Sequence, residues 1–406
     1  MSLPSIERHA PTFGRPTPWL LRPLLPRPDC GQIMIETPGG QRIAVSGARP
    51  GPKAALVLHR WRALRRLLTG GDLGFAEAYI DGDWSSPDLP SLLDFAVCNA
   101  DVFDNRLRAA LPVRLLHRVR HLLNANTTKG ARRNISFHYD LGNDFYRLWL
   151  DPLMIYSSAL YREPGQTLEQ AQEEKLRRIV ELLSPAAGEQ ILEIGCGWGA
   201  LALRLAQYQT HVTGVTLSTE QLGFAQELAA RAEASDRCRF ELRDYRNITG
   251  RFDRIVSIEM LEAVGERYWP TYFGKLRELL APHGKAVLQV ITIDETRFEG
   301  YRRTTDFIQR HVFPGGMLPT KSAIAREVEA AGLEVVGMET FGDSYARTLA
   351  EWRSRFLRAW SEAQPLGVDL RLRRLWDYYL CYCIAGFRAV WIDVGLYTLR
   401  HKSARA

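Results

Sequence analysis

Short apolar runs alternate with longer amphipathic stretches from residue 168 onward. Apolar runs of about five to eight residues predict buried strands, and apolar positions three or four residues apart predict helices. The predicted strands are 190–194, 211–215, 238–242, 253–258, 285–292 and 334–339, and the predicted helices are 168–183, 200–207, 219–233, 268–280 and 321–331. This alternation predicts an α/β fold with a doubly wound, Rossmann-like sheet.

Other patterns flank this region. Residues 1–30 are proline-rich without clear periodicity, so we expect an N-terminal arm. Short β-like runs and helical patterns predict a small α+β domain over 31–125, with a linker at 126–134 and the main domain at 135–406. Within the main domain we expect a large insertion at about 295–320, between the last two strands, and helices over 346–400.

The most distinctive segment is Ile191-Leu-Glu-Ile-Gly-Cys-Gly-Trp-Gly199, a buried strand followed by alternating glycines. Glycine lets the backbone approach a ligand where any Cβ would clash. The spacing differs from the Gly-x-Gly-x-x-Gly fingerprint of dinucleotide enzymes. It is the Glu-x-Gly-x-Gly-x-Gly turn typical of S-adenosylmethionine (SAM) methyltransferases.

SAM needs a turn for its methionine part, a polar group for its ribose and a slot for adenine. These should lie at the carboxyl ends of successive parallel strands. The chain supplies candidates in that order: Glu193, Gly195, Cys196, Gly197 and Gly199 after the first strand, Thr216 and Gln221 after the second, and Asp244 and Tyr245 after the third. The predicted cofactor is therefore SAM.

Basic residues are concentrated in one stretch. The formal net charge is +7 and the pI about 9.1. Residues 105–133 hold eight Lys and Arg residues, Arg114, Arg118 and Arg120 among them, with interleaved leucine and valine and no acid. This pattern suits a helix on an anionic membrane surface, and a solvated helix face is the alternative. We find no nucleic-acid-binding motif and expect no nucleic-acid partner.

The cysteines and the apolar runs bear on the compartment. Six scattered cysteines without a Cys-x-x-Cys pair indicate reduced, cytosolic thiols, and Cys381-x-Cys383 alone is a weak metal signal, so we expect no metal. No apolar run is long enough to span a bilayer, and residues 19–25 are broken by arginine and proline, unlike a signal peptide. We expect a cytoplasmic protein bound peripherally to the inner face of the membrane. The sequence leaves a homodimer open.

Five further segments, between about 137 and 355, resemble the cyclopropane fatty acid synthases, including the mycolic acid and plant enzymes. They are Phe137-His-Tyr-Asp-Leu-Gly-Asn-Asp-Phe-Tyr146, Met154-Ile-Tyr-Ser-Ser-Ala159, Phe252-Asp-Arg-Ile-Val-Ser257 with Glu262-Ala-Val-Gly265, Phe307-Ile-Gln-Arg-His-Val-Phe-Pro-Gly-Gly-Met-Leu-Pro319 and Tyr345-Ala-Arg-Thr-Leu-Ala-Glu-Trp352. Weaker similarity covers Gly74-Phe-Ala-Glu-Ala-Tyr-Ile-Asp-Gly82. The resemblance implies a helical, lipid-binding insertion in the SAM methyltransferase sheet.

The resemblance also implies a reaction. The family methylates a cis double bond in a phospholipid acyl chain, and loss of a proton from the new methyl closes a cyclopropane ring. A bound bicarbonate acts as the base and stabilises the cation. By motif, Tyr156 and Ser157 resemble SAM contacts, Glu262 resembles the glutamate that holds bicarbonate, and Tyr345 resembles the tyrosine that hydrogen-bonds it.

Three positions depart from the pattern common in the family. Ser158 stands where most members have cysteine, Gln289 where many have histidine, and Glu259 where bacterial members often have glycine; the plant-like members are most similar here. The backbone N–H of residue 158 serves an anion equally well from serine. Gln289 can donate a hydrogen bond to bicarbonate but cannot carry a proton as imidazole does.

The first expectation is therefore a SAM-dependent C-methyltransferase that forms cyclopropane rings on unsaturated phospholipid chains. Methyl branching or a methylene product without ring closure is the second, because proton removal is the step that Gln289 puts in doubt. A small-molecule methyltransferase is the third, since some plant alkaloid N-methyltransferases share the scaffold. A lipid-binding protein without activity is the fourth.

Overall fold

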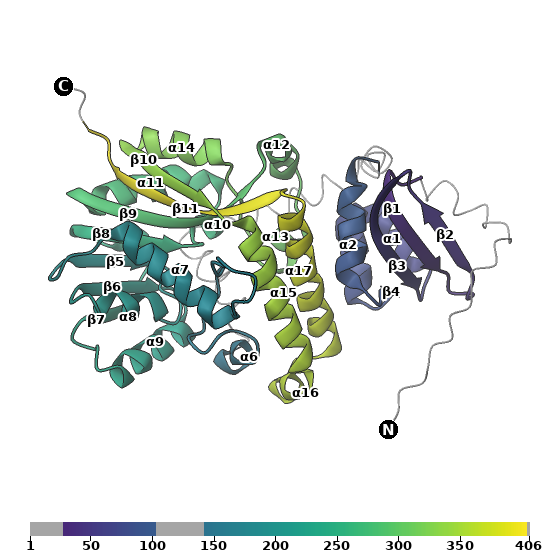
Figure 1. Ribbon diagram of the computed structural model, residues 1–406, viewed down its shortest axis with the longest axis horizontal. Coiled ribbons are helices and arrows are strands. Elements are labelled where there is room, and N and C mark those ends of the chain that lie inside the picture. Colours follow the sequence, from purple (N-terminus) through teal and green to yellow (C-terminus); the bar gives the residue numbers. More distant parts are fainter. Residues whose placement is uncertain (1–26, 103–141, 404–406) are drawn as a thin grey trace.

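Two β-sheets organise the chain in the computed structural model, which describes residues 27–102 and 142–403 (Figure 1). The larger sheet has the order β10-β11-β9-β8-β5-β6-β7, and the smaller one β2-β1-β3-β4. The predicted linker at 126–134, the basic stretch at 105–133 and the start of the motif at 137 lie outside the described residues. The predicted domain boundary therefore stays a prediction.

The larger sheet confirms the doubly wound α/β prediction. Its strands are β5 (Gln190–Ile194), β6 (His211–Thr216), β7 (Cys238–Leu242), β8 (Phe252–Ile258), β9 (Leu280–Ile293), β10 (Leu333–Thr340) and β11 (Ile392–His401). Neighbours from β9 to β7 pair in parallel, whereas β11 pairs antiparallel with both β9 and β10. The prediction of helix throughout 346–400 was wrong for β11. This short segment becomes a strand because it pairs with two strands that are distant in sequence.

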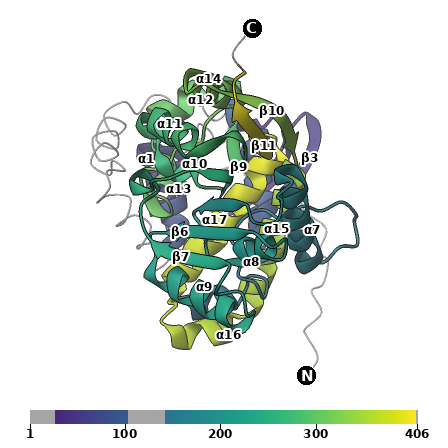
Figure 2. The same cartoon turned by 90° about the vertical axis from the view of Figure 1, so that its left-hand side faces the viewer.

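Helices cover both faces of this sheet because the residues of each strand alternate between two cores. Ile191 belongs to one core, with α7 (Leu168–Leu183), α8 (Ala200–Ala206) and α9 (Thr219–Arg231). Leu192 belongs to the other, with α10 (Leu261–Val264), α11 (Trp269–Leu279) and α14 (Lys321–Ala330). In both views α11 and α14 lie side by side (Figures 1 and 2).

Local signals set the helix starts. Thr167 and Gln170 form a capping box at the start of α7, and the Ser218 side chain accepts the Gln221 N–H at the start of α9. The expected insertion contains α12 (Glu295–Arg303) and α13 (Phe307–His311). The remaining elements are α6 (Asn143–Arg147), α15 (Gly342–Arg358), α16 (Trp360–Ala363), α17 (Leu370–Arg388) and the 3₁₀ turns η1 (Tyr245–Asn247), η2 (Glu266–Tyr268) and η3 (Gln364–Leu366).

The smaller sheet and two helices form the N-terminal α+β unit. Its elements are β1 (Cys30–Glu36), β2 (Arg42–Ser46), β3 (Arg49–Leu58), α1 (Arg62–Ile80), β4 (Trp84–Ser85) and α2 (Leu89–Cys98). Cys30 and Cys98 form a disulfide with 6.5 Å between their Cα atoms. This corrects the expectation of reduced thiols for that pair, because the pairing of two residues so far apart in sequence depends on the fold. Cys196, Cys238, Cys381 and Cys383 are free.

The helix α17 packs against α1 and α2 of the N-terminal unit, and α15 packs between α17 and the larger sheet, against β11 (Figure 1). The Tyr79 hydroxyl on α1 donates to Asp377 on α17, 2.9 Å away, and Arg388 on α17 pairs with Asp94 on α2. These polar contacts hold the N-terminal unit against α17. No helix in the described part of the chain has both the length and the apolar character that a bilayer span requires.

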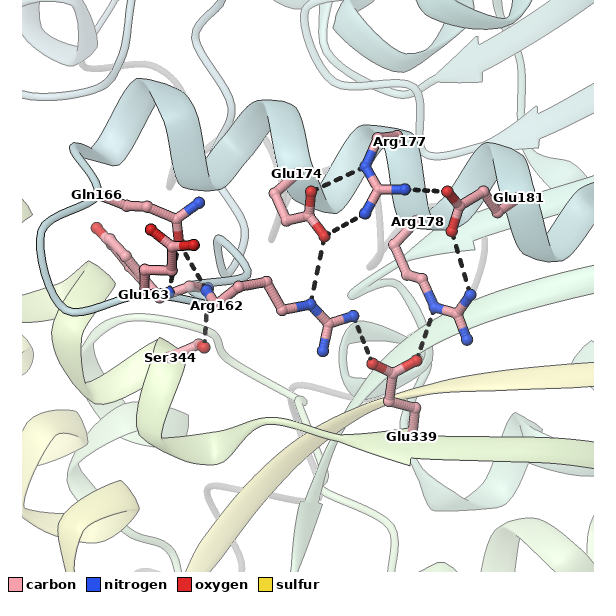
Figure 3. A network of polar contacts seen from close by, with 10 residues as sticks. Arg162, Glu163, Gln166, Glu174, Arg177, Arg178, Glu181, Glu339 and Ser344 are labelled. Atoms are coloured by element: carbon pink, nitrogen blue, oxygen red, sulfur yellow. Dashed lines mark hydrogen bonds and ion pairs between the residues drawn. The ribbon is translucent and has the colours of Figure 1, made fainter.

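A network of ion pairs fastens α7 to the edge of the larger sheet (Figure 3). Glu339 on β10 accepts from Arg162 and from Arg178, each at 2.8 Å. Glu174 and Glu181 extend the network along the helix through Arg177. The loop that precedes α7 carries Tyr156 and Ser157, so the network also supports the wall of the site.

Candidate active site

A cavity of about 980 Å³ opens at the carboxyl ends of the parallel strands. Its walls come from the ends of β5, β6 and β8, from α12 and α13, and from α15 and α17. Gly71, at a kink in α1, and Ala100, just after α2, line its other side. The cavity therefore extends from the strand ends to the N-terminal unit.

The glycine turn after β5 presents bare backbone to this cavity. Gly195 and Gly197 have φ of 81° and 52°, which L side chains rarely adopt. A Cβ on Gly195 would lie 2.4 Å from Cγ of Met260, whereas one on Gly197 would meet nothing within 4 Å. Packing thus excludes a side chain at Gly195, and open space for a ligand adjoins Gly197. Cys196 lies buried between them, and Gly199 is the N-cap of α8.

Glu193 lies below the turn as a buried acid. Its Oε2 has no hydrogen-bond partner among the described residues. Burial raises the pKa of Glu193 to about 8, although Lys175 opposes this shift. A cation or a hydrogen-bond donor bound at the turn would satisfy the unpartnered oxygen.

The candidate ribose contacts meet after β6. The Thr216 hydroxyl donates to Gln221 Oε1 across 2.8 Å, and both side chains are buried. Ser218 caps α9, and this cap places Gln221, in the first turn of the helix, beside the end of β6. The structure places these two residues together at the end of β6, and their contact with a ribose stays a prediction.

The candidate adenine contacts follow β7. Asp244 accepts from the backbone N–H and the guanidinium of Arg246, so it is held firmly at the cavity wall. Tyr245 is buried, with its ring centroid 5.5 Å from that of Tyr272. Both residues line the cavity where the third strand ends, as the sequence predicts.

Tyr156 and Ser157 line the cavity from the loop that precedes α7. The Tyr156 hydroxyl is 3.1 Å from that of Tyr379, and its ring lies between Trp149 and Trp352, at 5.5 and 5.3 Å. The Ser157 hydroxyl accepts a hydrogen bond from Lys175 Nζ at 2.7 Å. Both residues adjoin the cavity, as their resemblance to SAM contacts requires.

Lys175 is a site residue that the sequence analysis missed. It is buried on α7, and desolvation lowers its pKa to about 8 while Glu259, Asp151 and Glu193 oppose the shift. The available signal was a lysine on the apolar face of the helix predicted at 168–183, where burial is costly unless the charge is compensated. Lys175 is the cation that balances the acids around the cavity.

Glu259 is the centre of the polar contacts at the end of β8. Its Oε1 accepts from the Ser158 backbone N–H at 2.9 Å and from Gln289 Nε2 at 2.7 Å. Its Oε2 accepts from the Tyr345 hydroxyl at 2.7 Å. The three donors come from distant parts of the chain and converge on this one carboxylate.

Glu262 has different contacts. Its Oε1 accepts from the backbone N–H of Ile291, and its Oε2 has no partner in the described part of the chain. Burial, and then the charge of Glu259, raise the pKa of Glu262 to about 8. Burial also raises the pKa of Glu259, but its three donors oppose that rise, so negative charge is better stabilised on Glu259 than on Glu262.

The structure thus brings together three of the four residues predicted to surround bicarbonate, but around a different acceptor. Ser158, Gln289 and Tyr345 converge on Glu259, and Glu262 lies nearby without contacting any of the three. Glu259 directly follows β8, and its left-handed backbone (φ 51°) places the carboxylate among these donors. The sequence analysis noted Glu259 as a departure but did not assign it this place.

The two implied small molecules fit differently. SAM fits the bare backbone at Gly197, the unpartnered oxygen of Glu193 and the polar groups after β6 and β7. Bicarbonate does not fit, because each donor expected to bind it already has Glu259 as its acceptor.

Known proteins are similar to this chain in sequence and in fold. The family described as "Mycolic acid cyclopropane synthetase" matches residues 126–396. The chain is 37% identical to the tuberculostearic acid methyltransferase UfaA1 of Mycobacterium tuberculosis, over 87% of this chain and 85% of that protein. It is 36% identical to the cyclopropane-fatty-acyl-phospholipid synthase of Escherichia coli, over 86% and 87%.

A solved structure agrees with these matches. The mycolic acid cyclopropane synthase CmaA1, complexed with SAH and CTAB, superimposes with a TM-score of 0.63 and 32% identity. The match covers 66% of this chain and 97% of that one. These similarities confirm the class I SAM methyltransferase fold. The chain belongs to the mycolic acid cyclopropane synthetase family and is a SAM-dependent methyltransferase.

Proposed function

We propose that the protein transfers a methyl group from SAM to the cis double bond of an unsaturated phospholipid acyl chain and forms a cyclopropane ring. The observation that carries this proposal is the single cavity that joins the glycine turn to the N-terminal unit. Beyond the turn it is lined by aromatic and aliphatic side chains, Phe307, Tyr378 and Leu349 among them. An acyl chain is the ligand that such a long, apolar space suits.

The residues around the cavity suit an intermediate with positive charge on carbon. SAM supplies an electrophilic methyl when bound, and the alkene attacks it. The ring of Tyr156 and the carboxylate of Glu259 present negative charge to the cavity, which stabilises a cation there. The surrounding aromatic cluster excludes water, which would otherwise capture the cation.

The names of the relatives support a lipid substrate. The Escherichia coli relative is a cyclopropane-fatty-acyl-phospholipid synthase, and a Pseudomonas putida relative 39% identical over 64% of this chain is named a probable fatty acid methyltransferase. The basic stretch at 105–133 would hold the enzyme on the anionic, cytoplasmic face of a membrane, where such a substrate lies.

Lipid mass spectrometry of a heterologous host tests this function. Expression of the protein should add one CH₂ unit to unsaturated phospholipids, and Glu193→Gln should reduce the gain by weakening SAM binding. Mild hydrogenation then separates the products, because it saturates an olefin and leaves a ring. If hydrogenation converts the products that gained CH₂ into saturated branched chains, methyl branching without ring closure is indicated. If no phospholipid gains CH₂, a small-molecule substrate is favoured.

A further inference from the structure

We propose that the Glu259 carboxylate is a built-in base that takes the place of bicarbonate, so that turnover needs no bicarbonate. The inference rests on the proposed function and identifies the group that removes the proton. It goes against the expectation from the family resemblance, in which a separate anion plays this part.

Glu259 uses the hydrogen bonds that a bound anion would need. The Ser158 N–H and the Tyr345 hydroxyl each have one hydrogen to donate, and both donate it to Glu259. Gln289 Nε2 donates one hydrogen to Glu259 at 2.7 Å and lies 3.4 Å from the Ser158 carbonyl oxygen. A second anion in the same position would find these donors occupied and would face the negative charge of the carboxylate.

The backbone of Glu259 has an unusual conformation. Its φ is +51°, in the left-handed region that favours glycine. A non-glycine residue is strained there, and strain of this kind clusters at functional sites. The strained backbone directs the carboxylate to the three donors and to the wall of the cavity.

The charged groups around Glu259 also influence where negative charge is held. Burial raises the pKa of Glu259, while its three donors and the charge of Lys175 oppose that rise by stabilising the carboxylate. Glu262 has its pKa raised to about 8, partly by the charge of Glu259. Negative charge is therefore better stabilised on Glu259, which has three hydrogen-bond donors, than on Glu262, which has one, and the Glu259 carboxylate can accept a proton.

Methyl transfer and ring closure can be described with these groups as follows. The alkene forms a bond to the methyl carbon as the carbon–sulfur bond breaks, which leaves a cation on the chain. A C–H bond of the new methyl then breaks, its electron pair closes the ring, and the proton moves to Glu259. Oε2 accepts one hydrogen bond, from Tyr345, so it keeps an acceptor position for this proton. Loss of that proton to water after product release restores the carboxylate.

The test uses the full-length enzyme with SAM and vesicles of unsaturated phospholipid, in buffer depleted of carbon dioxide. The wild type should keep its rate, with less than about a twofold change when bicarbonate is added. Glu259→Gln should lower turnover by about a hundredfold or more, because the amide keeps the shape but cannot take the proton. SAM affinity should change little.

Glu259→Gly frees the three donors and relieves the strained backbone. It should lose activity in depleted buffer and regain part of it when bicarbonate is added, which a merely structural defect would not do. Glu233→Gly is the matched control, because Glu233 is exposed and also has a φ of 51°. It should keep the wild-type rate in both buffers.

Two results would overturn the inference. One is a wild type that loses about tenfold or more of its rate in depleted buffer and recovers it with bicarbonate. The other is Glu259→Gln with the wild-type rate. A wild type that binds SAM but adds no CH₂ to phospholipid in either buffer would instead contradict the proposed function.

Discussion

The Tyr345 hydroxyl donates a 2.7 Å hydrogen bond to Glu259, which lies 86 positions earlier in the chain. We expect Tyr345→Phe to lower turnover by about tenfold to a hundredfold, since a hydrogen bond to a charged group is worth about 1.5–3 kcal/mol. SAM affinity, measured by calorimetry, should stay near that of the wild type. Tyr208→Phe, at an exposed tyrosine, is the control. Equal turnover in the two variants would mean that this bond has no part in catalysis.

Gly197→Val tests the cofactor turn. The new side chain would enter the open space beside the turn, so SAM affinity should fall by at least about tenfold while the fold survives. Isothermal calorimetry measures the affinity and thermal unfolding the fold. Gly188→Val is matched, because Gly188 has a φ of 82°, is exposed and also has nothing within 4 Å of a built Cβ. Both variants carry the backbone strain, and only the first should lose SAM.

Glu262 should make stability depend on pH. Its pKa rises from 4.5 to about 8 on folding, so the folded state binds the proton more tightly than the unfolded state. This contribution to stability is complete below pH 4.5 and is lost as the pH rises through about 8. Glu262→Gln does not titrate, so the wild-type melting temperature should fall relative to that of the variant across this range. A constant difference would show that Glu262 stays ionised.

The basic stretch should bind anionic membranes. Replacing Arg114, Arg118 and Arg120 with glutamine should weaken binding to anionic vesicles, because each basic residue near the surface contributes about 1 kcal/mol. Vesicle sedimentation at low and high salt measures this effect. A variant with Arg231, Arg239 and Arg326 replaced by glutamine has the same net charge and should bind like the wild type. If both triple variants bind equally, the basic stretch has no special part in membrane binding.

Much of the fold follows from periodicity alone. The predicted strands 190–194 and 238–242 and the predicted helix 168–183 have the observed bounds, because their apolar positions face one or two cores along their whole length. β11 could not be found in this way. It follows a 19-residue helix in an aromatic-rich region, and its partners β9 and β10 are distant in sequence.

Some residues of the site could likewise be predicted from the sequence, and others could not. The glycine turn and the residues after β6 and β7 could be predicted, because consecutive strands of a parallel sheet deliver them to one edge. The place of Glu259 could not, since it depends on a left-handed backbone and on donors from three distant segments. A motif match assigned the acid three positions later, whose carboxylate points to Ile291 instead.

The position of β11 restricts the order in which the protein can fold during synthesis. β10 lies at the edge of the larger sheet, and β11 separates it from β9. Residues 333–340 therefore have no sheet partner until residues 392–401 have left the ribosome. The strands from β5 to β9 can pair earlier, as the nascent chain lengthens. The last step in assembling this sheet is thus the insertion of one strand between two others.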